Sequence, residues 1–173
     1  MLSDTIAAVS TSLLAASAIN IVRISGPDAC EVLGQSFRCR QKQWEGYRIY
    51  YGTIVEPDSG NSVDEVLVSI FRAPHSYTGE DMAEINCHGG LYVTRRIYGL
   101  CLEAGARPAI NGEFTRRAFL NGKIDLTQAE AVNDLINADG RSNARLAMNN
   151  LKGSVRKLLE PLMDDVMQII AHI

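Results

Sequence analysis

Two blocks decide the fold of this chain: APHSYTGEDMAEINCHGG at residues 73–90 and GEFTRRAFLNGKIDLTQAEAVNDLI at residues 112–136. The first block opens with a turn at Pro74 and continues into MAEINCH, whose alternation is typical of a strand. That alternation places Glu84 on the opposite face of the strand from Ile85. Carboxylates are uncommon in strands, so Glu84 leads us to interpret this block as part of a binding site.

The second block gathers charged residues around two phenylalanines. The charged residues are Glu113, Arg116, Arg117 and Lys123, and the aromatic residues are Phe114 and Phe119. This clustering of charge and aromatic surface predicts the rim of a ligand site. The block then passes into a helix at Asp125, a residue type that caps the N-terminus of a helix.

Outward from these blocks, the pattern predicts an α+β fold for the first part of the chain. We expect strands at residues 5–9, 19–24, 47–55, 63–71 and 82–88, and helices at residues 28–37 and 91–104. Asp28 is the expected N-cap of the first helix. The turn sequence PDSGN predicts that the third and fourth strands pair antiparallel. The residues of the second helix that are expected to face inward are Val93, Ile97, Leu100 and Cys101.

From Asp125 onward the pattern is helical. The first helix there carries an apolar stripe made of Leu126, Ala129, Val132, Leu135 and Ile136. Residues 143–173 continue with apolar side chains three and four positions apart, which predicts one long amphipathic helix with a kink or a restart at Pro161. The pattern still runs at Ile173 without a Gly or Asn cap, so we expect a truncated chain. The predicted domains are residues 1–124 and residues 125–173.

Length and composition fit one domain with an appendage. The chain has 173 residues, of which 46% are hydrophobic, and this is enough for a packed core. Its formal net charge of -3 excludes a strongly cationic nucleic-acid platform. The four cysteines form no CxxC pair and no basic segment precedes the first apolar stretch, which together favour a reduced, cytoplasmic setting. No apolar run reaches the roughly 20 residues that span a bilayer, so we expect no transmembrane helix.

Together with NIVRISGP at residues 20–27, these two blocks closely resemble the N-terminal part of the tRNA-modifying GTPases called MnmE or TrmE. The resemblance covers nearly the whole chain and is weakest at residues 30–61. It implies that the α+β domain is similar to the folate-binding domain of aminomethyltransferases, with a mixed or antiparallel sheet and packed helices. It also implies that this domain dimerises and binds 5-formyl-tetrahydrofolate as a one-carbon donor, and that an α-helical domain follows.

The resemblance further implies a role in tRNA modification. Members of the family act with a flavoprotein called MnmG, in a heterotetramer-type complex, and add an aminomethyl or carboxymethylaminomethyl group to the wobble uridine of certain tRNAs. A Ras-like G domain that uses GTP, magnesium and potassium interrupts the family's helical domain. The present sequence contains no GxxxxGK(S/T) motif and no C-terminal cysteine motif. We therefore expect the folate-binding half of the protein, without GTPase activity of its own.

Three residues match the family's folate contacts: Arg23 in IVRISG, Glu84 in EDMAEI and Lys123 in LNGK. A tetrahydrofolate presents N–H donors along its pterin edge and carboxylates at its glutamate end. Its site therefore needs an acceptor carboxylate and at least one cation. In this assignment Glu84 is the acceptor, and Arg23 and Lys123 are the cations. The sequence marks no catalytic residue, and we expect no metal site.

Each of these residues also has a structural interpretation. Arg23 could pair with a carboxylate at a sheet edge, Glu84 could lie on a solvated strand face, and Lys123 could be a surface lysine at a helix entry. Cys87 and His88 suggest metal or nucleophile chemistry. Adjacent strand residues point to opposite faces, however, and no other His or Cys has ligand spacing. We interpret His88 as structural.

One segment departs from the family pattern. Most relatives carry a Gly-rich stretch before the strand that contains Arg23, whereas this chain has SLLAASAIN at residues 12–20, which is bulkier and less able to adopt positive φ. The loop beside the ligand is therefore expected to differ. Two other functions remain open. One is a stand-alone aminomethyltransferase-like enzyme, which needs a catalytic acid in its pocket, and the other is a pure dimerisation module whose folate pocket has decayed.

Overall fold

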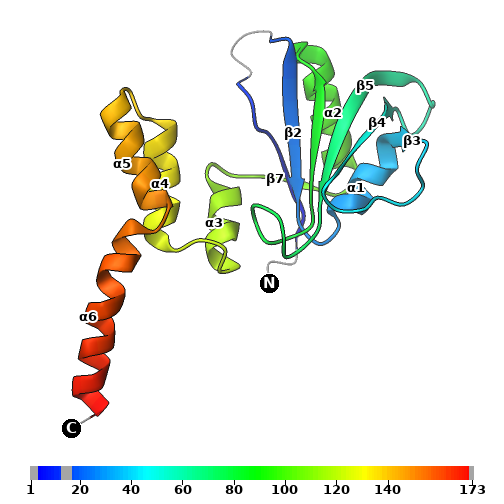
Figure 1. Ribbon diagram of the computed structural model, residues 1–173. Helices are drawn as coiled ribbons and strands as arrows, with labels where there is room; N and C mark the ends of the chain where they lie inside the picture. Colours follow the sequence, from blue (N-terminus) through cyan, green and yellow to red (C-terminus); the bar gives the residue numbers. More distant parts are fainter. Residues whose placement is uncertain (1–3, 13–16, 172–173) are drawn as a thin grey trace. The chain divides into compact units, whose positions relative to one another are not determined.

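The computed structural model describes residues 4–12 and 17–171, with only the backbone described at 155–160 and 163–164. The chain divides into two compact units, Met1–Arg117 and Ala118–Ile173 (Figure 1). The first unit combines a β-sheet with helices and the second is helical, which confirms the predicted fold class. Part of the segment SLLAASAIN lies outside the described residues, so the expected difference in that loop stays a prediction.

Seven strands among the described residues form one mixed sheet, in the order β3-β4-β5-β6-β2-β1-β7. The strands are β1 (Ile6–Val9), β2 (Ile19–Ser25), β3 (Phe37–Cys39), β4 (Arg48–Val55), β5 (Ser62–Phe71), β6 (Met82–His88) and β7 (Arg107–Pro108). All neighbours are antiparallel except β1 and β7, which are parallel. The predicted hairpin is confirmed, because β4 and β5 pair antiparallel on either side of PDSGN.

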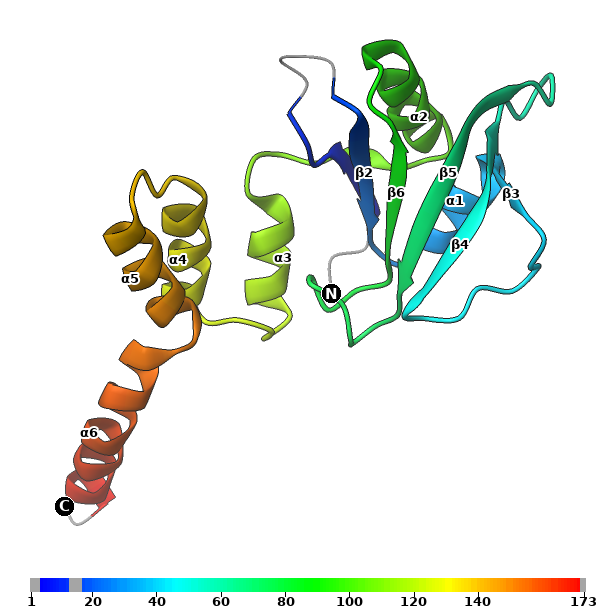
Figure 2. The same ribbon diagram turned by 45° about the horizontal axis from the view of Figure 1, so that its top comes forward.

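Helices α1 (Ala29–Ser36) and α2 (Leu91–Glu103) pack on the same side of this sheet (Figure 2). The hydrophobic core lies between these helices and the strands, and its residues include Val22, Ile24, Leu33, Val68, Ile70, Ile85, Ile97 and Leu100. Strands β2, β4, β5 and β6 contribute alternate residues to this core, as the pleat of a sheet requires. The helices therefore cover one face of the sheet.

The predicted inward face of α2 is largely confirmed. Its buried members are Ile97, Leu100 and Cys101. Val93 is only partly buried, and Thr94 is fully buried beside it. A polar residue is tolerated there because its hydroxyl accepts a hydrogen bond from Asn20 Nδ2, at 2.9 Å.

The opposite face of the sheet, which we call the open face, carries the predicted acidic residue. The alternation of β6 places Ile85 in the core and Glu84 on the open face, as predicted. The register of the sheet pairs Arg23 of β2 with Glu84 of β6, and Glu84 with Ser69 of β5. Two of the predicted site residues are therefore direct cross-strand neighbours.

Two features of the first unit differ from the prediction. Asp28 precedes α1, but its side chain makes no capping hydrogen bond, and its backbone N–H donates to Thr5 Oγ1 at 3.0 Å. The start of α1 is thus tied to the segment before β1. The charged stretch expected as a ligand rim is a helix, α3 (Glu113–Leu120), which runs across the boundary between the two units.

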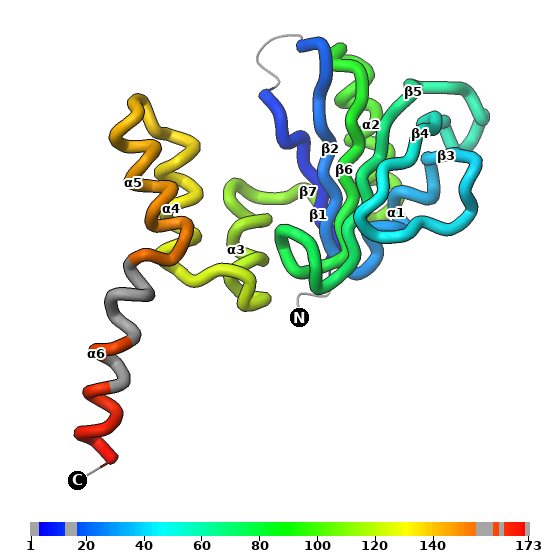
Figure 3. The backbone as a smooth tube through the Cα atoms, viewed as in Figure 1, coloured from blue at the N-terminus to red at the C-terminus, as the bar shows by residue number. Residues whose placement is uncertain are grey.

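The second unit continues from the end of α3 into further helices (Figure 3). They are α4 (Leu126–Ile136), α5 (Arg141–Leu151) and α6 (Ser154–Ala171). The predicted N-cap is confirmed, because Asp125 Oδ1 accepts from the N–H of Gln128 at 2.8 Å and Gln128 Oε1 accepts from the N–H of Asp125 at 2.9 Å. These two bonds satisfy N–H groups that have no partner within the helix, and they fix where α4 begins.

The apolar stripe predicted for α4 is only partly buried. Ala131 is the buried residue of this helix, whereas Leu126 and Ile136 are exposed. Ala131 lies between the predicted stripe residues Ala129 and Val132, and it was not expected to face inward. The buried position of α4 is therefore one that the predicted stripe does not include.

The prediction of one long helix over residues 143–173 is wrong. Helix α5 ends at Leu151, and the turn before α6 contains Gly153 at a φ of 75°. Glycine adopts this left-handed conformation without steric cost, so it interrupts an apolar pattern that continues on both sides. Pro161 lies inside α6, so the helix does not restart there. None of the described helices combines the length and apolar character that a membrane crossing needs.

Candidate functional site

An arginine and a glutamate form an ion pair on the open face. Arg23 Nη2 lies 2.7 Å from Glu84 Oε1, and Arg23 Nε donates to the same oxygen at 2.8 Å. The exposed fractions of the two side chains are 26% and 20%, so the pair is partly shielded and still accessible. The antiparallel register of β2 and β6 places both residues opposite each other and so creates the pair.

Two aromatic rings accompany Arg23. The guanidinium carbon of Arg23 lies 5.6 Å from the centroid of the Tyr77 ring and 5.3 Å from the centroid of the Phe114 ring. Both distances are within the range of cation–π attraction. The Tyr77 hydroxyl and Thr115 Oγ1 are 2.8 Å apart and share a hydrogen bond. The loop before β6 and the first turn of α3 therefore meet beside Arg23.

Lys123 belongs to the second unit. It follows Gly122, whose φ is 69°, in the turn after α3, and its backbone N–H donates to the carbonyl of Ala118 at 2.8 Å. The residue is exposed, as expected for a lysine at a helix entry. The structure thus brings Arg23 and Glu84 together, while the role of Lys123 stays a prediction.

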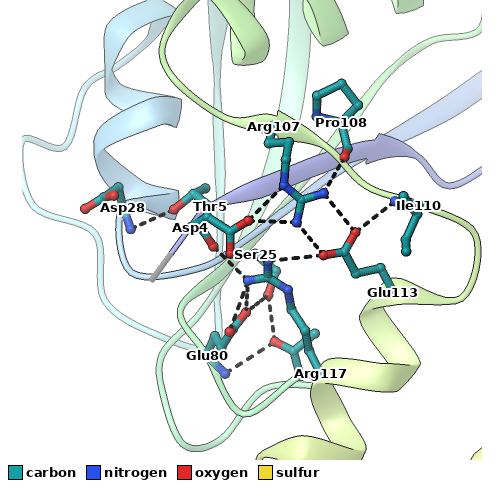
Figure 4. A network of polar contacts seen from close by, with 11 residues as sticks. Asp4, Thr5, Ser25, Asp28, Glu80, Arg107, Pro108, Ile110, Glu113 and Arg117 are labelled. Carbon is teal, nitrogen blue, oxygen red and sulfur yellow. Dashed lines mark hydrogen bonds and ion pairs between the residues drawn. The ribbon is translucent and has the colours of Figure 1, made fainter. Parts of the chain in front are cut away.

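A second arginine cluster lies at the N-terminal end of α3 (Figure 4). Arg117 has no exposed side-chain surface, and its Nη2 lies 2.8 Å from Asp4 Oδ1 and 3.3 Å from Glu113 Oε1. Its Nη1 lies 3.1 Å from Glu80 Oε2 and also donates to the carbonyl of Asp4 at 2.8 Å. Arg107 completes the cluster through ion pairs of 2.7 Å to Asp4 and 2.6 Å to Glu113. These five residues are called the buried network below, after its buried members Arg117 and Glu113, while the side chains of Asp4 and Arg107 are 42% and 44% exposed.

The buried network corrects part of the predicted ligand rim. Glu113 and Arg117 are buried and bonded to other protein groups, so they do not line an exposed site. Arg116 and Phe119, from the same helix, are exposed. The sequence could not reveal this difference, because Asp4, which pairs with Arg117, is more than a hundred residues away in the sequence.

The network lowers the pKa values of two of its carboxylates, Glu113 and Asp4. The hydrogen bond from Arg107, assisted by the N–H of Ile110 and opposed by burial, lowers the pKa of Glu113 to about 2. A hydrogen bond from Arg107 also lowers the pKa of Asp4. Both carboxylates therefore stay ionised at neutral pH, which keeps their attraction to the two arginines intact.

Two aromatic neighbours of Arg23 were not predicted to contact it, although Phe114 was part of the predicted ligand rim. Tyr77 and Phe114 both belong to the sequence blocks that decide the fold, and this was the only signal available. Their approach to Arg23 depends on the fold, because the three residues come from β2, from the loop before β6 and from α3.

Cys87 and His88 lie on opposite faces of β6. Cys87 is buried on the side of the helices, and burial raises the pKa of its thiol. His88 is exposed, and its Nδ1 lies 2.6 Å from Asp64 Oδ1. The opposite orientations agree with the alternation expected for adjacent strand residues.

Comparison with known proteins assigns both parts of the chain. The family model described as the GTP-binding protein TrmE N-terminus matches residues 5–123, and the model of the MnmE helical domain matches residues 126–173. The tRNA modification GTPase MnmE of Carboxydothermus hydrogenoformans is 48% identical over 177 residues, which cover 100% of this chain and 38% of that protein.

Two further relatives carry the same name. The tRNA modification GTPases MnmE of Pediococcus pentosaceus and Geobacillus kaustophilus are each 47% identical, over 98% of this chain and 37% of their own length. The chain therefore spans less than two fifths of the length of these relatives. Because both family models match in order and these relatives are 47–48% identical, the chain belongs to the MnmE (TrmE) family of tRNA modification GTPases, and it matches the family's N-terminal domain and helical domain.

Proposed function

We propose that this N-terminal domain binds 5-formyl-tetrahydrofolate as the one-carbon donor for tRNA modification. The observation that carries the proposal is the Arg23–Glu84 pair on the open face. Glu84 Oε1 accepts the hydrogen bond from Arg23 Nε and forms the ion pair with Arg23 Nη2. No hydrogen bond between described residues reaches Glu84 Oε2 or Arg23 Nη1, so one acceptor and one donor remain for a ligand.

These groups fit the edge of a pterin ring. A pterin carries neighbouring N–H groups, which donate hydrogen bonds to a carboxylate. It also carries a carbonyl oxygen, which accepts a hydrogen bond from a guanidinium. The rings of Tyr77 and Phe114 add aromatic surface beside Arg23, which suits a flat ligand. Lys123 is retained as the second proposed cation because it stands in the motif LNGK.

In this role the domain binds and orients the carrier, and the chemistry of transfer takes place in another component. We infer that the whole protein acts as a tRNA modification GTPase in the cytoplasm, with the wobble uridine of certain tRNAs as substrate. MnmG is the proposed flavoprotein partner, in a heterotetramer-type complex. GTP, magnesium and potassium are assigned to a G domain outside the sequence described.

We also propose that the α+β domain forms a homodimer. The open face exposes the apolar side chains of Ile49 and Tyr51 on β4 and of Leu67 on β5, and Tyr51 pairs with Leu67 in the register. Strand β3 pairs only with Gly52–Ile54, so the first half of β4 has a free outer edge within the described part of the sheet. Exposed apolar residues next to a free strand edge are surfaces that self-association covers.

Calorimetric titration tests the folate proposal. The isolated chain should release heat with 5-formyl-tetrahydrofolate and none with GTP, and it should not hydrolyse GTP. A folded sample that gives no heat at high micromolar folate would favour the pure dimerisation module. Turnover of GTP above the rate in buffer would contradict the assignment of the nucleotide site to a separate G domain.

A further inference from the structure

We propose that Tyr77 and Phe114 are positioning residues for the ligand site, because their rings hold the Arg23 guanidinium in the orientation in which Glu84 keeps one oxygen free. The inference rests on the proposed folate function and adds two residues to it. Both rings touch Arg23, and neither was predicted as a folate contact from the sequence.

The need for such residues follows from the side chain of Arg23. Arginine has several rotatable bonds, and fixing them costs conformational entropy. Arg23 is 26% exposed and bonded to a single oxygen, so Glu84 alone leaves it considerable freedom. Ring centroids at 5.6 and 5.3 Å from the guanidinium carbon add cation–π attraction, which favours one orientation.

The two rings are themselves held by neighbouring contacts. The Tyr77 hydroxyl shares a hydrogen bond with Thr115 Oγ1, at 2.8 Å, directly beside Phe114 in the sequence. Glu113 precedes Phe114 and is fixed by Arg107 and by the N–H of Ile110, at 2.6 and 2.8 Å. The rings therefore stand on anchored backbone, so they can restrict Arg23 instead of moving with it.

The loop that carries Tyr77 is anchored in the same way. Ser76 Oγ donates to the carbonyl of Glu80 at 2.5 Å, and the Glu80 carboxylate accepts from Ser25 Oγ at 2.8 Å. Ser25 lies two positions after Arg23 on β2. Hydrogen bonds therefore join β2, which carries Arg23, to the loop that carries Tyr77, and join that loop to α3, which carries Phe114.

The consequence for binding is preorganisation. With the guanidinium fixed, its Nη1 and the free Glu84 Oε2 keep a constant separation, which a rigid heteroaromatic edge can match without an ordering cost at binding. A guanidinium that moves freely would instead have to be ordered by the ligand. The rings are therefore expected to change affinity even though the hydrogen-bonding groups stay the same.

A double-mutant cycle with 5-formyl-tetrahydrofolate tests the role of the rings. Phe114→Leu should weaken binding about tenfold, and Phe114→Tyr, which restores an aromatic face, should bind within about twofold of the wild type. In an Arg23→Lys background, Phe114→Leu should cost less than about twofold, because the group that it positions is gone. Tyr92→Leu is the control and should leave binding unchanged, since Tyr92 is an aromatic residue of the same unit that is 78% exposed on α2.

A second measurement needs no ligand. In ¹⁵N-arginine NMR spectra, the Nε–H signal of Arg23, assigned with Arg23→Lys, should be sharp in the wild type and in Tyr77→Phe, and broadened in Phe114→Leu. Circular dichroism confirms that each variant is folded. A sharp signal in Phe114→Leu would overturn the positioning role.

The titrations separate this inference from the proposed function. Wild-type chain that binds folate while Phe114→Leu binds equally well overturns the positioning role alone. Equal losses from Phe114→Leu in the wild-type and Arg23→Lys backgrounds also overturn it, because the effect would then not pass through Arg23. Wild-type chain that binds no folate overturns the proposed function, and with it the role of the rings in binding.

Discussion

Two arginine–carboxylate clusters lie in the same α+β unit and differ in how completely their arginines are enclosed. Arg117 has no exposed side-chain surface and contacts carboxylates from three segments, Asp4, Glu80 and Glu113. Arg23 is partly exposed and contacts one oxygen of Glu84. The same residue types thus hold the fold in one place and remain available to a ligand in the other. Enclosure and the number of carboxylate partners, more than residue type, separate the two roles.

Removal of Arg117 should have the largest effect on stability. In Arg117→Met, three carboxylates lose a buried counter-charge, so the free energy of unfolding should fall by about 3 to 5 kcal/mol. Urea denaturation followed by circular dichroism measures the loss. Arg116→Met, at the exposed neighbouring position, is the control and should change stability by less than about 0.5 kcal/mol. A loss below about 1 kcal/mol in Arg117→Met would remove the distinction between the clusters.

Acid should act on the buried network next. The folded-state pKa of Glu113, about 2, lies below the ordinary value of 4.5. Its ionisation therefore stabilises the fold fully above pH 4.5, and this contribution is lost as the pH falls toward 2. The loss should amount to about 3 kcal/mol in urea denaturation measured across that window. The lowered pKa of Asp4 acts in the same direction.

The control for the pH effect is Glu113→Gln. This variant should be less stable at neutral pH and should lose less stability between pH 4.5 and 2, because it has no carboxylate to protonate at position 113. Parallel acid profiles for the variant and the wild type would assign the acid sensitivity to other groups.

Glu84 should show the opposite profile, with an effect on binding and little on folding. Glu84→Ala should weaken binding of 5-formyl-tetrahydrofolate by about 2 kcal/mol, and Glu84→Gln, which retains one acceptor oxygen, should cost less. Stability should change by less than about 1 kcal/mol in both, because the pair is partly exposed. Glu31→Gln, at an exposed position of α1, is the control, and its affinity for 5-formyl-tetrahydrofolate in calorimetry should equal that of the wild type. Equal losses in both Glu84 variants would show that Glu84 does not contact the pterin edge.

The smallest expected effect concerns association. Tyr51→Lys on the open face should weaken the proposed homodimer about tenfold, because a lysine ammonium would enter an apolar contact. Leu162→Lys, at an exposed position of α6, should leave the dimer unchanged. Sedimentation velocity of both variants, and of a chain without residues 143–173, decides between the two surfaces. A shortened chain that sediments as a monomer would place the contact on the helices.

The sequence predicted those parts of the fold whose causes are local. The bounds of β6 followed from the alternation of MAEINCH and the two glycines after it, and Asp125 was correctly identified as a cap because its partner, Gln128, is three residues away. The orientation of Glu84 followed from the same alternation. None of these predictions requires knowledge of distant contacts.

Other features depend on distant partners and could not be predicted. Helix α3 carries charges that resemble a solvated rim until Asp4, Glu80 and Arg107 are placed around them. Similarly, the break at Gly153 was concealed because the apolar spacing continues on both sides of it. For the candidate site, the residue types followed from the resemblance, whereas the Arg23–Glu84 contact and its aromatic neighbours required the strand register.

The contact between Asp4 and Arg117 also bears on how the protein is made. Asp4 is synthesised well before Arg107 of β7 and Arg117 of α3, its partners, which follow it by more than a hundred residues. The β4–β5 hairpin can form early from local pairing, but the edge of β1 that faces β7 has to wait. During translation this edge of β1 stays unpaired and open to incorrect partners until β7 emerges.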